Sequence, residues 1–431
     1  MRELIESVCS GFTEFDPPPD ESVVDGPIGW PGYDAARRRA RERTGERESV
    51  ICGSGKIGDV EATLIVFEFG FLGGSVGRRT GDRIEAAFTR ARELRTPVVS
   101  LIATGGSRMQ EGMAALSQLQ RIARQVALTR AAGIPQISVL RDPTTGGGWA
   151  TLGAGADVVL ALPGAQVGFA GSRVRPPGNE QAYTAESQLA SGHVDQIVND
   201  LPVALARWLT LLTQGTGGAP EPPTSLRQTE LPQTGWDAVL AARAPERPRA
   251  DAYLDAYFDW RENVSGDRCG GVDAGVHCGF GSRNGMTIAY AAQCGTATLP
   301  SGFRTAARLI RLADRLGIPV LTLVDTPGAA NDGAAERAGA GAGIAEVFGA
   351  IAAASVPVTT LVIGEGGSGG ALAFAAPGRT WVTPDSYFSV TSPEAAAAIL
   401  KRPPEEIPAT AEQLRLRPQD LVELGVVQGI V

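Results

Sequence analysis

The chain repeats one pattern of strand, glycine-rich turn and helix. Residues 97–107 (PVVSLIATGGS) are echoed by residues 319–329 (PVLTLVDTPGA) at an offset of 222 positions. Two further phrases return in the same order. Residues 135–147 return as 357–370, with the paired glycines 223 positions apart, and residues 162–169 return as 383–390 at an offset of 221. The chain therefore contains two copies of one αβ unit.

In each copy, two apolar strands end in glycine where a helix is expected to begin. The first N–H groups of a helix lack partners within the helix and carry partial positive charge. Two such turns that converge on one oxygen would form an oxyanion hole. Glycines that only close a tight turn are the better explanation of any single pair, but four pairs at matched spacing favour the hole. The expected hole residues are Gly105, Gly106, Gly146 and Gly147 in the first copy and Gly328, Ala329, Gly369 and Gly370 in the second.

Apolar segments with strand character alternate with longer segments of helical character in both copies, which predicts an α/β fold. In the first copy, strands are expected over residues 63–69, 98–103 and 137–140, and helices over 81–95 and 111–132. In the second copy, strands are expected over 286–291, 320–324 and 358–363, and helices over 302–316 and 341–354.

Composition narrows the functional classes. The net charge of −8 argues against a general nucleic-acid partner, whose binding surface would be basic. No apolar run approaches the ~18 residues that a membrane span needs, and the N-terminus lacks an apolar signal core. We therefore expect a cytoplasmic protein that binds neither nucleic acid nor membrane.

Side chains offer little for metal or nucleophilic chemistry. The chain has two histidines, and its five cysteines form no Cys-x-x-Cys pair, so no metal site is expected. Ser107 follows a glycine turn, but nothing in the sequence brings a base such as His193 to it. Residues 364–369 match Gly-x-Gly-x-x-Gly, yet they come late in the repeat, where a dinucleotide-binding turn is not expected.

Composition shifts divide the chain into four segments. Residues 1–50 are expected to form an N-terminal arm with a surface helix, whose basic run at 37–41 is interpreted as a solvated face. The first αβ domain covers residues 51–213 and the second covers 236–431. Residues 214–235, rich in glycine and proline, are expected to be a linker.

A glycine-rich loop, residues 67–77, follows a predicted strand and precedes several arginines. Such a loop lets a backbone approach a ligand closely, and arginine suits a phosphate-bearing ligand. An ordinary turn accounts for the loop equally well when it is considered alone.

These motifs resemble a known family. Residues 67–77, 103–111, 142–147 and 168–171 closely resemble the β subunit of bacterial acetyl-CoA carboxylase carboxyltransferase. Residues 302–304, 325–329, 363–373 and 392–394 resemble its α subunit, so the chain looks like a β–α fusion. The resemblance covers roughly residues 50–200 and 236–431, and it implies two tandem crotonase-like (ClpP/crotonase) domains.

The resemblance implies transfer of a carboxyl group from carboxybiotin to the α-carbon of an acyl-CoA, most simply acetyl-CoA to give malonyl-CoA. The first copy would hold the thioester oxygen and the second the biotin oxygen. Biotin is attached to the lysine of a Met-Lys motif, and neither Lys56 nor Lys401 follows a methionine. Biotin is therefore expected on a separate carrier protein, which is charged by a biotin carboxylase. The family's shared site implies a dimer or larger homo-oligomer. CoA would be held by Gly73, Gly74, Ser75, Gly77, Arg78 and Arg108.

Three features depart from the family pattern. Residues 1–50 lack the zinc ribbon of the β subunit, a shortened segment occupies residues 293–300, and residues 173–178 differ after the Gly-Phe-Ala-Gly turn. The altered 293–300 segment keeps open a malonyl-thioester decarboxylase. The missing zinc ribbon keeps open a non-catalytic scaffold within a carboxylase complex.

Overall fold

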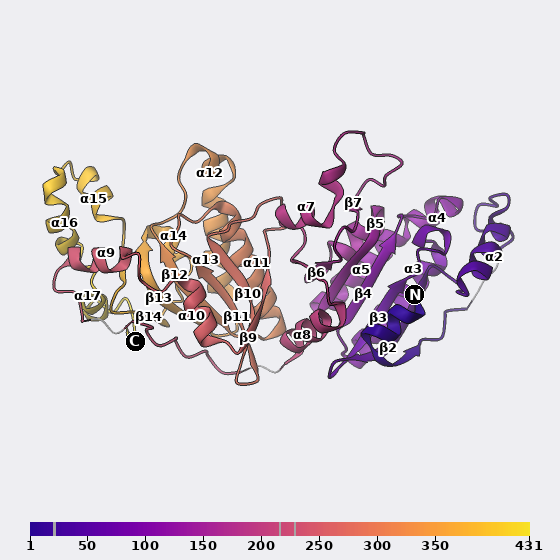
Figure 1. Cartoon of the computed structure of the whole chain (residues 1–431), viewed down its shortest axis with the longest axis horizontal. Helices are drawn as coiled ribbons and strands as arrows, with labels where there is room; N and C mark the ends of the chain where they lie inside the picture. The colour runs from indigo at the N-terminus through magenta and orange to yellow at the C-terminus, as the bar shows by residue number, and fades with distance from the viewer. Residues whose placement is uncertain (20–22, 215–216, 228–229) are drawn as a thin grey trace. The chain divides into compact units, whose positions relative to one another are not determined.

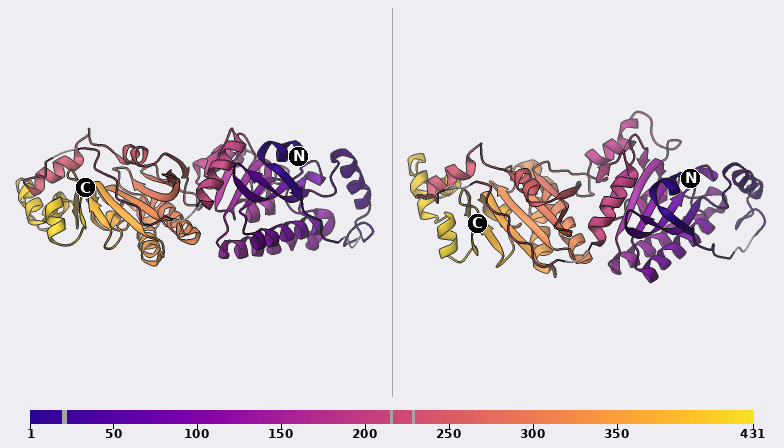
Figure 2. Two further views of the ribbon diagram at one scale, coloured as in Figure 1. Left: turned by 90° about the horizontal axis from the view of Figure 1, so that it is seen from below. Right: turned by 60° about the horizontal axis from the view of Figure 1, so that its bottom comes forward.

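The computed structural model describes residues 1–19, 23–214, 217–227 and 230–431. The chain divides into two compact units, Met1–Thr213 and Gln214–Val431, which we call unit 1 and unit 2. Each unit is built on one sheet with helices against its faces (Figures 1 and 2). The alternation of strands and helices confirms the predicted α/β class.

The sheet of unit 1 has the strand order β1-β2-β3-β4-β5-β6-β8, and β7 pairs with the end of β5. Strands β1 to β3 are antiparallel neighbours, and the strands from β3 onward are parallel. The strands are β1 (Ser10–Glu14), β2 (Val50–Ile57), β3 (Val60–Phe67), β4 (Val98–Thr104), β5 (Gln136–Thr145), β6 (Val158–Ala161), β7 (Val167–Gly168) and β8 (Gln196–Ile197).

Unit 2 repeats this topology strand for strand. Its order is β9-β10-β11-β12-β13-β14-β16, with β15 paired to the end of β13. The equivalence confirms the internal duplication seen in the sequence. The strands are β9 (Trp260–Val264), β10 (Val276–Arg283), β11 (Met286–Gln293), β12 (Val320–Thr326), β13 (Val358–Gly367), β14 (Thr380–Val382), β15 (Tyr387–Ser389) and β16 (Gly429–Ile430).

Helices cover both faces of each sheet. In unit 1, α3 packs with α5 on one face and α8 lies against β2 and β3. In unit 2, α11 packs with α13, while α10 joins alternate residues of β11, β12 and β13 in a second core. The helices are α1 (Arg2–Val8), α2 (Tyr33–Thr44), α3 (Arg78–Leu94), α4 (Gly112–Leu116), α5 (Gln118–Ala131), α6 (Gly146–Gly148), α7 (Ala185–Ala190), α8 (Leu201–Thr213), α9 (Gly235–Arg243), α10 (Ala250–Tyr257), α11 (Pro300–Leu316), α12 (Gly333–Arg337), α13 (Ala340–Ala353), α14 (Ser368–Leu372), α15 (Pro393–Ile399), α16 (Ile407–Gln413) and α17 (Pro418–Glu423).

The central strands explain why the repeat is so visible. Every residue of β4 and of β12 is buried, because parallel strands with helices on both faces expose neither side. Such strands appear as mainly apolar runs; β4 is followed directly by Gly105, and β12 is followed by Pro327 and Gly328. The fold thus places the two turns of each unit at the same edge of its sheet.

Two segments differ from their expected form. The helix expected over residues 111–132 is broken at Ser117 into α4 and α5. The Ser117 hydroxyl donates to the carbonyl of Ala114 at 3.2 Å, a back-bond that bends helices. The expected N-terminal arm is also less separate than its composition indicates, because β1 pairs with β2 as the edge strand of the sheet.

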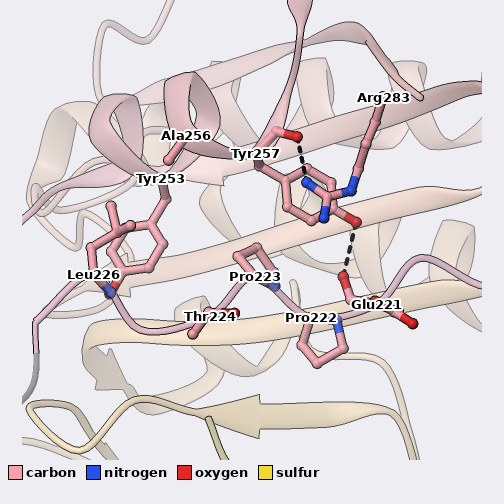
Figure 3. Close-up of a pocket in the computed structure, with 9 residues that line it drawn as sticks. All are labelled: Glu221, Pro222, Pro223, Thr224, Leu226, Tyr253, Ala256, Tyr257 and Arg283. Carbon is pink, nitrogen blue, oxygen red and sulfur yellow. Dashed lines mark hydrogen bonds between the residues drawn. The ribbon is translucent and has the colours of Figure 1, made fainter. Parts of the chain in front are cut away.

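The linker-like segment packs onto unit 2 over its described residues 217–227. The Tyr257 hydroxyl donates to the carbonyl of Glu221 at 2.8 Å, and the Thr359 hydroxyl donates to the carbonyl of Pro220. Arg283 stacks on the Tyr257 ring at 4.0 Å and donates to its carbonyl. Figure 3 shows the small pocket that this arrangement leaves between the segment and α10. These contacts order a stretch whose composition alone indicates a flexible tether.

None of the helices within the described residues is long and apolar enough to span a bilayer.

Candidate functional site

The two glycine turns of unit 1 meet at the ends of β4 and β5. A Cβ placed on Gly146 would lie 3.0 Å from the Cα of Gly106, and one on Gly106 would lie 3.8 Å from the backbone N of Gly147. Gly106 has φ 102° and Gly146 has φ 65°, which is backbone that favours glycine. The structure therefore brings together the four residues predicted for the first hole.

Most of their N–H groups are used within the unit. Gly105 donates to the carbonyl of Gly73 at 2.8 Å, Gly106 to Oγ1 of Thr104 at 3.0 Å, and Gly146 to the carbonyl of Phe169 at 3.1 Å. Gly147 is the second residue of α6, where an N–H has no partner within the helix. Of the four predicted donors, Gly147 is therefore the best placed to bind an external oxygen.

The backbone N–H of Ser107 is a candidate donor that the sequence analysis missed. Val76 donates to the carbonyl of Gly106 and accepts from the N–H of Arg108, forming a parallel bridge with Ser107. In such a bridge the N–H of Ser107 itself points away from Val76. The repeat contained the signal, since Ser107 lies 222 positions before Ala329.

Unit 2 builds the same junction. Thr298 bridges Ala329 as Val76 bridges Ser107, and Gly328 donates to Oγ1 of Thr326 at 3.1 Å. A Cβ on Gly370 would lie 2.4 Å from the backbone N of Ala329. The predicted residues of the second hole are thus also brought together.

The structure corrects the predicted pairing of the second turns. Strand β5 ends at Thr145 and β13 ends at Gly367, so the offset at this point is 222 rather than 223. Gly146 therefore corresponds to Ser368, which has φ 57°, and Gly147 corresponds to Gly369. The sequence alignment paired Gly146 and Gly147 with Gly369 and Gly370 because both are glycine pairs. The backbone instead keeps the offset of 222 residues that relates the rest of the two turns.

The glycine-rich loop lies directly beside the first hole. Its carbonyl at Gly73 accepts from Gly105, and a Cβ on Gly74 would lie 2.0 Å from the carbonyl oxygen of Ala103. At the end of the loop, Gly77 adjoins the side chains of Arg108 and Glu111. The loop is therefore close enough to share a ligand with the hole.

Arg108 lies inside unit 1, with 1 % of its surface exposed, instead of facing a ligand. Its guanidinium donates to both carboxylate oxygens of Glu48, at 2.5 and 3.1 Å, and to the carbonyl of Ser75 at 2.7 Å. It also donates to the hydroxyl of Tyr33, which donates to Glu111. Arg108 thus fixes the loop from beneath.

Glu48 is ionised in this cluster. Burial alone raises the pKa of a carboxyl, but the charge and hydrogen bonds of Arg108 outweigh it and lower the pKa of Glu48 to about 2. Glu111 accepts from the backbone N–H of Arg78, the first residue of α3. The start of α3, beside the predicted phosphate loop, therefore already carries an internal carboxylate.

Unit 2 holds its junction with a different cluster. Asp325, at the end of β12, is fully buried and accepts from Arg247 at 2.8 Å and from Arg249 at 3.1 Å. Its other carboxylate oxygen accepts from the N–H of Glu365, and its carbonyl accepts from Gly295. Asp325 thereby joins both strand ends to the short segment after β11.

Gln293 lies beneath the second hole. Its side chain is fully buried, and Nε2 donates to the carbonyl of Gly370 and to Oγ1 of Thr298, both at 3.1 Å. Its Oε1 has no hydrogen-bond partner in the described part of the chain. The equivalent position in unit 1, set by the pairing of β3 with β4 and of β11 with β12, is the apolar Phe67.

No group of three or more His, Cys, Asp or Glu side chains among the described residues is arranged to hold a metal ion.

Comparison with known proteins identifies the class. Residues 30–196 match the family described as "Carboxyl transferase domain", and residues 226–431 match "Acetyl co-enzyme A carboxylase carboxyltransferase-like". Unit 1 and unit 2 thus each carry a carboxyltransferase-type domain. A transcarboxylase 12S structure with methylmalonyl-coenzyme A and methylmalonic acid bound aligns with a TM-score of 0.83 at 20 % identity, covering 100 % of this chain and 86 % of that chain. This likeness confirms the expected crotonase-like fold.

Two relatives identify the family. "Acetyl-coenzyme A carboxylase carboxyl transferase subunits beta/alpha" of Saccharopolyspora erythraea is 39 % identical over 421 residues, covering 93 % of this chain and 74 % of that protein. The "Probable biotin-dependent acyl-coenzyme A carboxylase beta3 subunit" of Mycobacterium bovis is 32 % identical over 420 residues, covering 94 % and 84 %. The chain belongs to the acetyl-coenzyme A carboxylase carboxyl transferase beta/alpha family.

Proposed function

We propose that the chain is an enzyme that transfers a carboxyl group between carboxybiotin and the α-carbon of a short acyl-CoA, with acetyl-CoA and malonyl-CoA as the simplest pair. The observation that carries the proposal is the presence of two equivalent converging turns in one chain. The names of its relatives support the reaction class.

In unit 1, we assign the thioester oxygen to the N–H of Gly147 together with that of Ser107. Gly105, Gly106 and Gly146 fix the turn through their internal hydrogen bonds. Removal of the α-proton places negative charge on the thioester oxygen, and fixed N–H donors stabilise that charge without reorganising. One such donor typically contributes about 2.7–4 kcal/mol to lowering the barrier.

In unit 2, the turn of Gly328 and Ala329 with that of Gly369 and Gly370 forms the corresponding cradle for the biotin ureido oxygen. The fit is supported by Gly370, where a Cβ would fill the space against Ala329. Carboxybiotin supplies the activated carboxyl group. The chain's own residues bind and orient that oxygen through backbone N–H groups.

The proposal places CoA along the loop of Gly73, Gly74, Ser75 and Gly77, with Arg78 exposed at its end. Arg108 acts as a positioning residue that holds the loop. Biotin arrives on a separate carrier protein charged by a biotin carboxylase, and the enzyme works in the cytoplasm as a dimer or larger homo-oligomer. The transcarboxylase 12S neighbour, which is described as a hexamer assembly, supports the oligomer.

The first test is exchange of ¹⁴C between acetyl-CoA and malonyl-CoA, with and without a biotinylated carrier. Exchange that requires the carrier is expected. Release of CO₂ from malonyl-CoA that ignores biotin would overturn the proposal in favour of a decarboxylase.

A second test removes one donor. A side chain at Gly147 would lie 2.3 Å from Cδ1 of Leu119, so both variants also carry Leu119→Ala. Gly147→Pro deletes the N–H and is expected to lower kcat about 10²–10³-fold relative to Gly147→Ala, which keeps it. Equal activity of the two variants would contradict the assignment of this donor.

A further inference from the structure

Helix α2 carries an arginine run that the proposed chemistry does not use. Five of its twelve residues are arginine, against the acids Asp34 and Glu42, in a chain whose net charge is −8. Arg38, Arg39 and Arg41 are exposed, and none of their side chains forms an ion pair or hydrogen bond with another described residue. The arginines of the helix are Arg37, Arg38, Arg39, Arg41 and Arg43.

Helix stability does not explain this run. Arg37 and Arg41 are four positions apart, as are Arg39 and Arg43, and like charges at this spacing destabilise a helix. The one ion pair within α2 joins Arg37 to Asp34 at 3.8 Å, which is a long and weak contact. The uncompensated charge therefore indicates an anionic ligand outside the helix.

The position of α2 indicates which ligand. The helix packs against Leu72–Gly74, and its first residue, Tyr33, donates to Glu111 beneath the loop. Near its other end, Arg43 donates to the carbonyl of Gly70. The helix is thus anchored at both ends along the glycine-rich loop, and the same helix exposes Arg38, Arg39 and Arg41.

The loop itself offers one exposed cation, Arg78 at its end, to a ligand with several phosphate groups. The N-terminus of α3 attracts anions in principle, but the Glu111 carboxylate already accepts the N–H of Arg78 there. Arg108 beneath the loop is committed to Glu48 and Ser75. Further cations for these phosphate groups must therefore come from a neighbouring element, and α2 supplies arginines, whose forked guanidinium suits phosphate.

We propose that Arg38, Arg39 and Arg41 of α2 form an anion site that binds the phosphate groups of the CoA nucleotide. The proposal rests on the proposed function, because it takes acyl-CoA as the ligand of the adjacent loop. It changes the interpretation of this run from a solvated face to a part of the substrate site.

The test uses the full chain with Arg38, Arg39 and Arg41 all changed to Gln, which removes charge but retains helix propensity. The control changes three exposed arginines on other helices, Arg90, Arg124 and Arg311, to Gln. With a biotinylated carrier, we expect the α2 variant to raise KM for acetyl-CoA about tenfold or more, with kcat little changed. The control should retain the KM of the parent chain.

Substrate truncation locates the effect. The parent chain is expected to prefer acetyl-CoA over acetyl-dephospho-CoA, which lacks the 3′-phosphate, and the α2 variant is expected to lose that preference. Calorimetric titration with adenosine 3′,5′-bisphosphate provides a readout that is independent of activity. Binding is expected for the parent chain and the control, and weaker binding for the α2 variant.

Each other outcome is decisive. An unchanged KM with the preference retained would overturn the proposal. A raised KM for the carrier protein instead would assign α2 to an acidic protein surface and also overturn it. If the parent chain transfers no carboxyl group yet binds the bisphosphate through α2, the proposed function fails while the nucleotide site stands.

Discussion

Unit 1 and unit 2 form the same backbone junction with different supports. Both have a parallel bridge into the first turn, Val76–Ser107 and Thr298–Ala329, and both have a threonine hydroxyl that accepts the glycine N–H. Beneath this shared path, unit 1 uses the Arg108 cluster and unit 2 uses the Asp325 cluster. The comparison teaches that backbone bridges define the turn, while the buried charges that support it differ in identity and in position.

The largest effect should come from removing the central arginine of either cluster. Arg108→Met leaves Glu48 buried without its partner, and Arg247→Met removes a fully buried donor to Asp325. Each should lower the free energy of unfolding of its own unit by about 3–5 kcal/mol. Hydrogen exchange resolved by unit should show the loss confined to the unit that carries the change. Loss spread equally over both units would show that the supports are not independent.

The stability of the two units should respond to acid in opposite ways, because Glu48 in unit 1 and Asp273 in unit 2 have pKa values shifted in opposite directions. The pKa of Glu48 is lowered to about 2, so its contribution is complete above the unfolded pKa near 4.5 and is lost as pH falls toward 2, amounting to about 3 kcal/mol. Burial raises the pKa of Asp273 despite its bonds to Leu299 and Gly275, so its contribution is present at low pH and lost as pH rises. Between pH 5 and 2, the free energy of unfolding of unit 1 should depend less steeply on pH in Glu48→Gln than in the parent chain.

The control for this pair is Asp273→Asn in unit 2. It should remove a destabilisation that grows as pH rises, and it should leave the acid response of unit 1 unchanged. An identical acid response in the parent chain and in Glu48→Gln would contradict the low pKa of Glu48.

Exchanging the residues at the start of α6 and α14 should have opposite effects. Ser368 occupies a left-handed backbone position, so Ser368→Gly should stabilise unit 2 by about 1 kcal/mol. Gly146→Ser should destabilise unit 1 by more, because its Cβ would lie 3.0 Å from Gly106. Denaturant unfolding of the two variants measures both values. A destabilised Ser368→Gly would show that the serine side chain contributes more than its strain costs.

The smallest effect should come from changing Gln293, which lies beneath the second hole. Gln293→Met removes the hydrogen bond to the Gly370 carbonyl and should cost about 1 kcal/mol. Its activity readout is KM for the biotinylated carrier, which should rise, while KM for acetyl-CoA stays unchanged. A change confined to acetyl-CoA would reverse the proposed division of substrates between the units.

Local signals made the fold and the meeting of the turns predictable. In each unit the apolar run of the strand, β4 or β12, lies within a few positions of the glycines that follow it. The repeat shows this pattern twice. The offset error at Gly369 and Gly370 arose because glycine identity was matched where backbone conformation decides.

The supports were not predictable because they join distant residues. Arg108 meets Glu48 across 60 positions and Tyr33 across 75, and no periodicity encodes such pairs. The hydrogen bond from the Gly146 N–H to the carbonyl of Phe169 is likewise a tertiary contact. The linker composition was misleading for residues 217–227, because prolines and glycines can pack on tyrosines as readily as they form a tether.

The hole donors assigned in both units are main-chain N–H groups. This limits the substitutions by which the protein could become resistant to an inhibitor. A substitution can change a side chain in one step, but every residue except proline retains its N–H. An inhibitor whose oxygen binds the N–H of Gly147 therefore leaves few routes to resistance at that contact. Escape would have to act on the path of the backbone, and at Gly147 the adjacent Leu119 already restricts that path.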